Sequence, residues 1–290
     1  MTERLRYALV TAARDEAANL PRLAESLFAQ TVVPHDWVVI DNGSTDETRE
    51  IAFSVSTSCS WVHVLELPGE RTPRRGAPIV RAFMDGVATL APLPEIVVKL
   101  DADVSMESDY FARLLEEFES DPTLGIASGT CWELQNGSWR PQHVTRDHAR
   151  GAVRAYQREC LSAVLPLVER VGWDGIDELE AQTRGWRVRS FPDLPFHHHR
   201  SLGRRERRAP MWVEQGDMAH FMGYRPSYLV ARAAYRALRD PVAVAMLYGY
   251  TLAALRRSPQ YHDAAVRQLL RNEQSLRRLP QRIREALGRT

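Results

Sequence analysis

Alternation of strand-like and helix-like segments constrains the fold of this 290-residue chain more than any other feature. The N-terminal part contains apolar segments typical of strands, separated by segments in which apolar residues recur at helical spacing. The strand patterns cover 6–14, 36–42, 60–68 and 95–104, and the helical patterns cover 15–30, 44–52 and 76–90. This alternation is typical of βαβ units, in which helices cover a parallel sheet. The sequence therefore predicts an α/β fold with a mainly parallel central sheet.

Acidic side chains follow the predicted strands. Asp15 comes after the first strand, Asp41 ends the second, and Asp101 and Asp103 follow the apolar stretch 97–100. In sheets of this kind ligands bind at the carboxyl ends of the strands. A pair of carboxylates one residue apart suits Mg²⁺ or Mn²⁺, which prefer oxygen ligands and recruit substrate phosphates. Alternatively, the pair is a helix cap or a turn.

The middle of the chain predicts different local structures. A hairpin is expected at 131–141, turning at Asn136 and Gly137. The stretch 149–171 is predicted to be helical, with a break at Pro166. A loop, a short helix and a strand are expected from 172 onward, and the strand runs into three consecutive histidines.

From residue 225 the alternation ends and successive helices are predicted. Residues 225–290 carry 13 arginines and four acidic residues, a net charge of +9, which leaves −8 for 1–224 in a chain of net charge +1. We therefore expect a first domain over 1–222 and a basic helical extension over 223–290. The uncharged run 241–255 is shorter than the roughly 20 residues that cross a bilayer. The extension could contact an anionic membrane surface, or pack on the first domain, or form a homodimer.

Cysteine usage and the N-terminus both favour a cytoplasmic location. Cys59, Cys131 and Cys160 are odd in number and form no C-x-x-C pair, so no disulfide framework or thiolate zinc site is predicted. The first ten residues, MTERLRYALV, lack the apolar run of an export signal. We expect the protein either free in the cytoplasm or held at the inner face of the membrane by its C-terminal helices.

Three segments closely resemble the family 2 glycosyltransferases, which have the glycosyltransferase-A fold. They are LVTAARDEAANLPRLAESLFAQ at 9–30, WVVIDNGSTDETREIA at 37–52 and VVKLDADV at 97–104. The resemblance covers at least 7–130. It implies a nucleotide-diphospho-sugar transferase fold, a catalytic domain over 1–222, and Mn²⁺ or Mg²⁺ as the cofactor.

The resemblance also implies which residues bind the donor. The positions that would contact the nucleotide sugar are Ala12, Ala13, Asp15, Asp41, Asp101 and Ala102. Many family members have asparagine where this chain has Asp15. Asp103 would be a metal ligand, and a histidine at the end of the later strand would complete the metal shell. The local pattern favours His198, then His199, for that role.

Four arginines precede the fourth strand and could contact the donor phosphates. Arginine suits bidentate phosphate contacts, and the residues are Arg71, Arg74, Arg75 and Arg81. We expect Arg75 or Arg81 to make the contact. Alternatively, the RTPRR segment is a solvated loop.

A catalytic base is expected in GWDGIDELEAQ, at 172–182. The candidates are Asp174, Asp177, Glu178 and Glu180. Asp177-Glu178 resembles the acidic pair of the family, and we favour Glu178 as the base, with Asp177 as its rival. Acidic residues in the first turn of a helix are also stabilised by the helix dipole without any catalytic role.

The predicted activity is a one-step displacement with inversion at the anomeric carbon. A sugar would move from a nucleotide-diphosphate donor to a hydroxyl of a glycan, a polysaccharide or a lipid-linked acceptor, and no nucleic acid would be bound. A nucleotidyltransferase is an alternative, although TAARDEAANL lacks the glycine-rich phosphate loop of that class. An inactive nucleotide-sugar-binding module is a further alternative.

Overall fold

The structure is a computed structural model that describes residues 4–69, 76–135, 137–142, 148–199 and 208–275. The chain divides into two compact units, 1–201 and 202–290. This division lies earlier than the boundary predicted after residue 222. Arg75 and the other arginines of the RTPRR segment lie outside the described residues.

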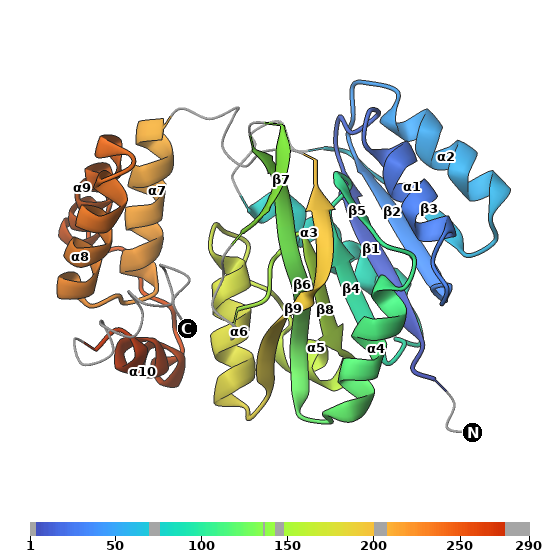
Figure 1. Cartoon of the computed structure of the whole chain (residues 1–290). Coiled ribbons are helices and arrows are strands. Elements are labelled where there is room, and N and C mark those ends of the chain that lie inside the picture. The colour runs from blue at the N-terminus through green and yellow to red at the C-terminus, as the bar shows by residue number, and fades with distance from the viewer. Residues whose placement is uncertain (1–3, 70–75, 136, 143–147, 200–207, 276–290) are drawn as a thin grey trace. The chain divides into compact units, whose positions relative to one another are not determined.

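The first unit contains a single mixed sheet of nine strands in the described part of the chain (Figure 1). Its order is β3-β2-β1-β4-β8-β6-β9-β5, with β7 paired to β6. Strands β3, β2, β1 and β4 are parallel, β6 and β9 are parallel, and β8 runs antiparallel between β4 and β6. The strands are β1 (Tyr7–Ala13), β2 (Asp36–Asn42), β3 (Val62–Leu67), β4 (Ile96–Leu100), β5 (Val104–Met106), β6 (Leu124–Gln135), β7 (Ser138–Pro141), β8 (Val153–Gln157) and β9 (Arg187–His198).

Helices cover both faces of the sheet. Residues of β1 show this, because Leu9 packs in a cluster with α1, α2 and α4, whereas Val10 packs in a second cluster with α3, α5 and α6. The helices are α1 (Leu20–Phe28), α2 (Thr48–Ser58), α3 (Ala77–Thr89), α4 (Tyr110–Ser120), α5 (Arg158–Val164) and α6 (Trp173–Thr183). The predicted α/β fold is therefore confirmed, with the core in two layers on either side of the sheet.

Strand register brings the acidic strand ends to one edge. Ala13 pairs with Asp41 between β1 and β2, and Val10 pairs with Lys99 between β1 and β4. Asp101 lies two residues beyond Lys99. The carboxyl ends of β1, β2 and β4 therefore lie at the same edge of the sheet, as expected for adjacent parallel strands.

The helix predicted over 149–171 is wrong in its first half. Residues 153–157 form β8, which fills the position between β4 and β6, and only 158–164 form a helix, α5. Arg154 interrupts the apolar pattern of this segment, but its side chain is completely buried among partners from other elements. A local periodicity cannot show that such a residue faces inward.

The second unit is helical in its described residues. It contains α7 (Arg208–Phe221), α8 (Pro226–Ala237), the 3₁₀ helix η1 (Pro241–Val244), α9 (Ala245–Leu255) and α10 (Ala264–Glu273). Helices α7 and α9 pack closely. The prediction of helices after residue 225 is confirmed, whereas α7 was not predicted. No helix in the described residues is long and apolar enough to cross a membrane.

Candidate active site

The paired aspartates follow β4 at the carboxyl edge of the sheet. Asp103 is buried and Asp101 is partly exposed. Lys99, on the same strand, forms an ion pair with Asp101 and donates a hydrogen bond from Nζ to the carbonyl oxygen of Gly151 (2.7 Å). Burial and the neighbouring Asp103 raise the pKa of Asp101, and Lys99 opposes that rise. Lys99 therefore offsets part of the charge of the pair.

His198 reaches the aspartates from β9. Its Nε2 lies 3.1 Å from Asp103 Oδ1, and β9 is held there because Val104 of β5 pairs with His198. Potential ligand atoms of Asp101, Asp103 and His198 all lie within 4.8 Å of one another. Burial lowers the pKa of His198, but the hydrogen bond with Asp103, the Cys131 thiol and the two aspartate charges raise it to about 10.

This group fits a divalent cation by its chemistry. Two carboxylates and one imidazole suit Mn²⁺ or Mg²⁺, which keep some positions for water and phosphate oxygens. The structure thus brings together Asp101, Asp103 and His198 from the predicted site. His199 is not part of the group.

His197 and His199 lie on the other face of β9 from His198. The ring of Trp139, on β7, is centred 4.5 Å from that of His197 and 5.3 Å from that of His199. His199 Nε2 lies 2.8 Å from Ser105 Oγ. Burial and the charges of Arg22 and His197 lower the pKa of His199 to about 4. His197 and His199 therefore share Trp139 as a neighbour, whereas His198 contacts Asp103.

The loops after β1 and β2 are joined by hydrogen bonds. The carboxylate of Asp15 accepts from the backbone nitrogen (2.8 Å) and the hydroxyl (3.1 Å) of Thr45. The Asp41 carboxylate accepts from the Ser44 nitrogen (3.2 Å), and the Ser44 hydroxyl accepts from the Asp15 nitrogen (3.2 Å). Asp15 has a φ of 56°, a left-handed conformation that aspartate tolerates better than most residues. These contacts fix the corner of the sheet where Ala12, Ala13 and Asp41 lie.

Arg81 lies on α3 and forms an ion pair with Glu169. Both side chains are exposed. Arg81, a predicted phosphate contact, therefore has an acidic partner in the same unit.

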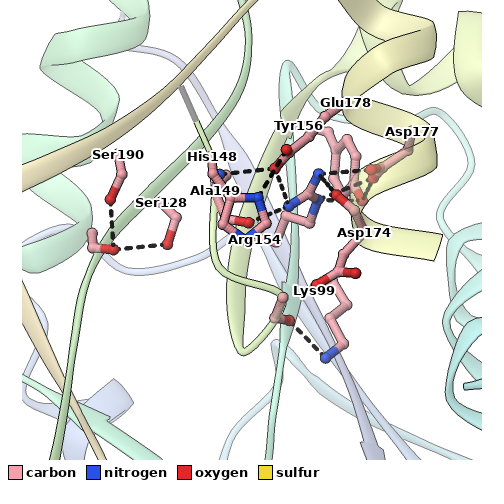
Figure 2. A network of polar contacts seen from close by, with 12 residues as sticks. Lys99, Ser128, His148, Ala149, Arg154, Tyr156, Asp174, Asp177, Glu178 and Ser190 are labelled. Carbon is pink, nitrogen blue, oxygen red and sulfur yellow. Dashed lines mark hydrogen bonds and ion pairs between the residues drawn. The ribbon is translucent and has the colours of Figure 1, made fainter. Parts of the chain in front are cut away.

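Arg154 joins Asp177 and Glu178, the two predicted bases (Figure 2). Its Nη2 donates to Asp177 Oδ1 (2.7 Å), its Nε to Asp177 Oδ2 (3.0 Å), and its Nη1 to Glu178 Oε1 (3.0 Å). Tyr156 donates from its hydroxyl to Asp177 Oδ2 (2.6 Å). Burial opposes the charge of Arg154, but the surrounding acidic groups raise its pKa well above the ordinary value. We call Arg154, Tyr156, Asp177, Glu178 and His148 the Arg154 network.

Glu178 is held by further donors. Its Oε1 accepts from the backbone nitrogen of Ala149 (2.8 Å), and its Oε2 lies 2.9 Å from His148 Nδ1. Burial lowers the pKa of His148, but the hydrogen bond with Glu178 and its charge give a net rise. Every oxygen of the Glu178 carboxylate thus has a partner.

Asp174 differs from its neighbours in the acidic segment. It is partly exposed in the first turn of α6, and its carboxylate points away from the Arg154 guanidinium, toward Lys99, in Figure 2. A Cβ added at Gly151 would lie 3.4 Å from Asp174 Oδ2, and the Gly151 carbonyl accepts from Lys99. Asp174 therefore lies close to Gly151, whose carbonyl accepts from the lysine that pairs with Asp101.

Sequence reasoning missed three residues that shape the site. Lys99 has a visible signal, because it is the one lysine of the chain and stands inside an apolar strand. Arg154 of β8 has none, and neither has Glu133 of β6, whose Oε1 lies 3.8 Å from His198 Nδ1. Both residues meet their partners through contacts with distant segments.

Comparison with known proteins identifies the class. The sequence model described as "Glycosyl transferase family 2" matches residues 8–230. An uncharacterised glycosyltransferase of Nostoc sp. (strain PCC 7120) is 24% identical over 195 residues. That match covers 58% of this chain and 56% of the relative, so the chain spans about half the length of this relative.

Solved structures share the fold. The mannosyltransferase PcManGT from Pyrobaculum calidifontis, in complex with GDP-Man and Mn²⁺, gives a TM-score of 0.60 at 17% identity and covers 98% of this chain and 85% of its own. TarS 1–349 of S. aureus, in complex with UDP-GlcNAc, gives 0.57 at 15% identity and covers 74% and 66%. These structures have the glycosyltransferase-A fold, and this chain shares it. The chain belongs to glycosyltransferase family 2.

Proposed function

We propose that this chain transfers a sugar from a nucleoside-diphosphate donor to an acceptor hydroxyl, in a metal-dependent reaction that inverts the anomeric carbon. The observation that carries the proposal is the convergence of Asp101, Asp103 and His198 at the carboxyl edge of the sheet. PcManGT, which shares the fold, was solved with GDP-Man and Mn²⁺.

The residues of the chain would hold the leaving nucleotide. Asp103 and His198 would be ligands of Mn²⁺ or Mg²⁺, and Asp101 would lie beside the ribose and diphosphate. A bound cation stabilises the negative charge that develops on the departing diphosphate. Ala12, Ala13 and Asp41, at the ends of β1 and β2, would contact the base, and Ala102 would approach the diphosphate. Arg75 and Arg81 stay predictions as phosphate contacts.

We propose Asp174 as the base that removes the proton of the acceptor hydroxyl. The sequence favours Glu178 and then Asp177, but both are buried and bound to Arg154. A base must reach the acceptor proton directly or through one water. Asp174 is partly exposed and lies on the side of Lys99, which favours it over its neighbours.

The proposal extends to the acceptor and the location. We propose a cytoplasmic enzyme whose acceptor is a glycan, a polysaccharide or a lipid-linked sugar. The second unit exposes apolar residues beside arginines, which fits contact with an anionic membrane surface. Homodimerisation through the same helices is the competing proposal.

A panel of nucleoside-diphosphate sugars tests the proposed activity. We expect donor hydrolysis or transfer with Mn²⁺ or Mg²⁺, none with EDTA, and loss of turnover in Asp103→Ala. Proton NMR of the first product should show the anomeric configuration opposite to that of the donor. Full activity in EDTA, or in Asp103→Ala, would contradict the metal assignment. Nucleotide binding without turnover for any donor and acceptor would favour an inactive binding module.

A further inference from the structure

Glu133 lies behind His198, on the side of the imidazole away from Asp103. The shortest approach is 3.8 Å, between Glu133 Oε1 and His198 Nδ1. Each residue is only 5% exposed. Neither of these two atoms has a hydrogen-bond partner among the described residues, and both are fully enclosed.

Two buried polar atoms in this state call for a physical explanation. A buried polar group without a hydrogen bond costs about 1–3 kcal/mol, and more if it is charged. The separation of 3.8 Å exceeds a hydrogen bond, so a small rotation of the imidazole would bring the two atoms together. The opposite nitrogen, Nε2, is already 3.1 Å from Asp103. His198 thus lies between two carboxylates, one at each ring nitrogen.

We propose that Glu133 is a positioning residue that orients His198 for metal binding, an inference that rests on the proposed function. A nitrogen that binds a metal must present its lone pair, so when Nε2 binds the cation, Nδ1 carries the proton. Glu133 then accepts the Nδ1–H bond. Metal-binding histidines generally donate their other N–H to such a carboxylate, which fixes the ring and makes it a better ligand.

A second arrangement uses the opposite nitrogen. Ligand atoms of Cys131, Glu133 and His198 also lie within 4.8 Å of one another, all three residues buried. A thiolate would favour Zn²⁺, bound through Nδ1, with Nε2–H donating to Asp103. The first arrangement is favoured because it uses both carboxylates of the strand end, where a donor phosphate can reach the ion. The two arrangements differ in whether Cys131 matters.

The inference is tested by measuring how tightly the full chain binds Mn²⁺. EPR monitors the binding, first with Mn²⁺ alone and then with GDP or UDP added. Loss of a residue that orients a metal ligand typically weakens metal affinity by about 10–100-fold, which is the loss expected for Glu133→Leu. Glu133→Gln should lose less, because its amide oxygen can still accept the Nδ1–H bond without the charge. Cys131→Ala, a buried position on the same strand, should bind Mn²⁺ like the wild type.

Pulsed EPR separates orientation from a general effect on the fold. The wild type should show coupling of Mn²⁺ to an imidazole nitrogen, His198→Ala should lose it, and Glu133→Leu should weaken it while melting cooperatively. If Glu133→Leu does not fold, Glu133→Gln carries the test. Unchanged affinity and nitrogen coupling in the folded Glu133 variants would overturn the inference.

The remaining outcomes distinguish this inference from the proposed function. If the wild type binds no Mn²⁺ in any of these conditions, both fail. If binding is lost in Asp103→Ala but unaffected at Glu133, only the role of Glu133 fails. Zinc that co-purifies with the chain and disappears in Cys131→Ala would assign Glu133 to the thiolate site instead.

Discussion

Arg154 is the residue whose loss should cost the most stability. It is fully buried and satisfies two carboxylates, Asp177 and Glu178. Arg154→Met would leave Asp177 buried without a cation and Glu178 with His148 as its one basic partner among the described residues. Removal of one partner from a buried ion pair costs about 3–5 kcal/mol. We expect urea titrations to show that the free energy of unfolding decreases by that amount. Arg158→Met, which removes a partly exposed arginine at the start of α5, is the matched control and should change little.

Asp174 and Glu178 should differ in what they do to catalysis. Asp174→Asn should lower kcat by about 10²–10⁴-fold, the usual contribution of a general base, without affecting donor binding. Glu178→Gln should mainly lower stability, because it removes a charged partner of Arg154 and His148. Steady-state kinetics and thermal melts of both variants show whether each substitution affects catalysis or stability. A Glu178→Gln variant that keeps its Tm and loses transfer would return the base to Glu178.

His148 should make stability depend on pH above about 6.5. Its pKa is raised in the folded chain by Glu178, with a smaller contribution from Asp174 and against burial and Arg154. In the unfolded chain it titrates near its ordinary pKa of about 6.5. The protonated form therefore favours the folded state, so its contribution is complete below about pH 6.5 and is lost as pH rises through the higher folded value.

Urea titrations across that range measure the effect. The free energy of unfolding should fall more steeply with pH in the wild type than in His148→Gln. Parallel curves would contradict a role for His148 in holding Glu178.

At the residue scale the sequence predicted the group at the strand ends more readily than the residues that support it. Asp101, Asp103 and His198 stand at strand ends, where a local pattern places them. Lys99, Glu133 and the partners of Arg154 meet through contacts between distant segments, which no local pattern predicts. The same limit explains the preference for Glu178, since Arg154 comes 24 residues earlier in the chain.

At the scale of elements, most strands and helices followed from hydrophobic periodicity, and β8 did not. Strand β8 lies between β4 and β6 in the sheet, and its residue Arg154 is fully buried there. A short segment directly followed by helix α5 looks helical as a whole, because a five-residue strand gives too little alternation to detect.

The contact between α7 and α9 depends on two glycines. A Cβ added at Gly249 would lie 2.0 Å from the Val213 carbonyl oxygen, and one at Gly216 would lie 1.9 Å from that of Met246. Gly249→Ala should therefore force the helices apart, at a cost of about 1–3 kcal/mol for an overpacked core. Hydrogen exchange should show faster exchange in both helices.

Gly175→Ala in α6 is the matched control. A Cβ there meets nothing within 4 Å, and alanine favours a helix over glycine by about 1 kcal/mol. We expect unchanged or slower exchange in that variant. If α7 and α9 are as protected from exchange in Gly249→Ala as in the wild type, the close approach of the two helices is contradicted.

At the scale of the whole molecule, the two units divide the chemistry. The first contains the residues proposed to bind the donor, and the second contains a net positive segment with exposed apolar side chains. Val244, Tyr248 and Leu255 are 53%, 63% and 77% exposed, and their spacing of four and seven residues places them on one side of η1 and α9. Leu238 is 82% exposed, and Arg239, Arg256 and Arg257 are exposed beside this surface.

This surface predicts binding to anionic membranes. Apolar residues insert at the interface, and each arginine near an anionic surface adds about 1 kcal/mol, which salt weakens. We expect the full chain to float with phosphatidylserine-containing vesicles at low salt, and to bind weakly at high salt or to neutral vesicles. Leu255→Ser with Arg256→Ser and Arg257→Ser should abolish flotation, whereas Phe53→Ser, an exposed apolar residue of the first unit, should not. The contrary outcome is a chain that fails to bind anionic vesicles, sediments as a dimer, and becomes monomeric in the triple variant. That outcome would assign the surface to a second copy, because the same apolar side chains would then be buried between two molecules.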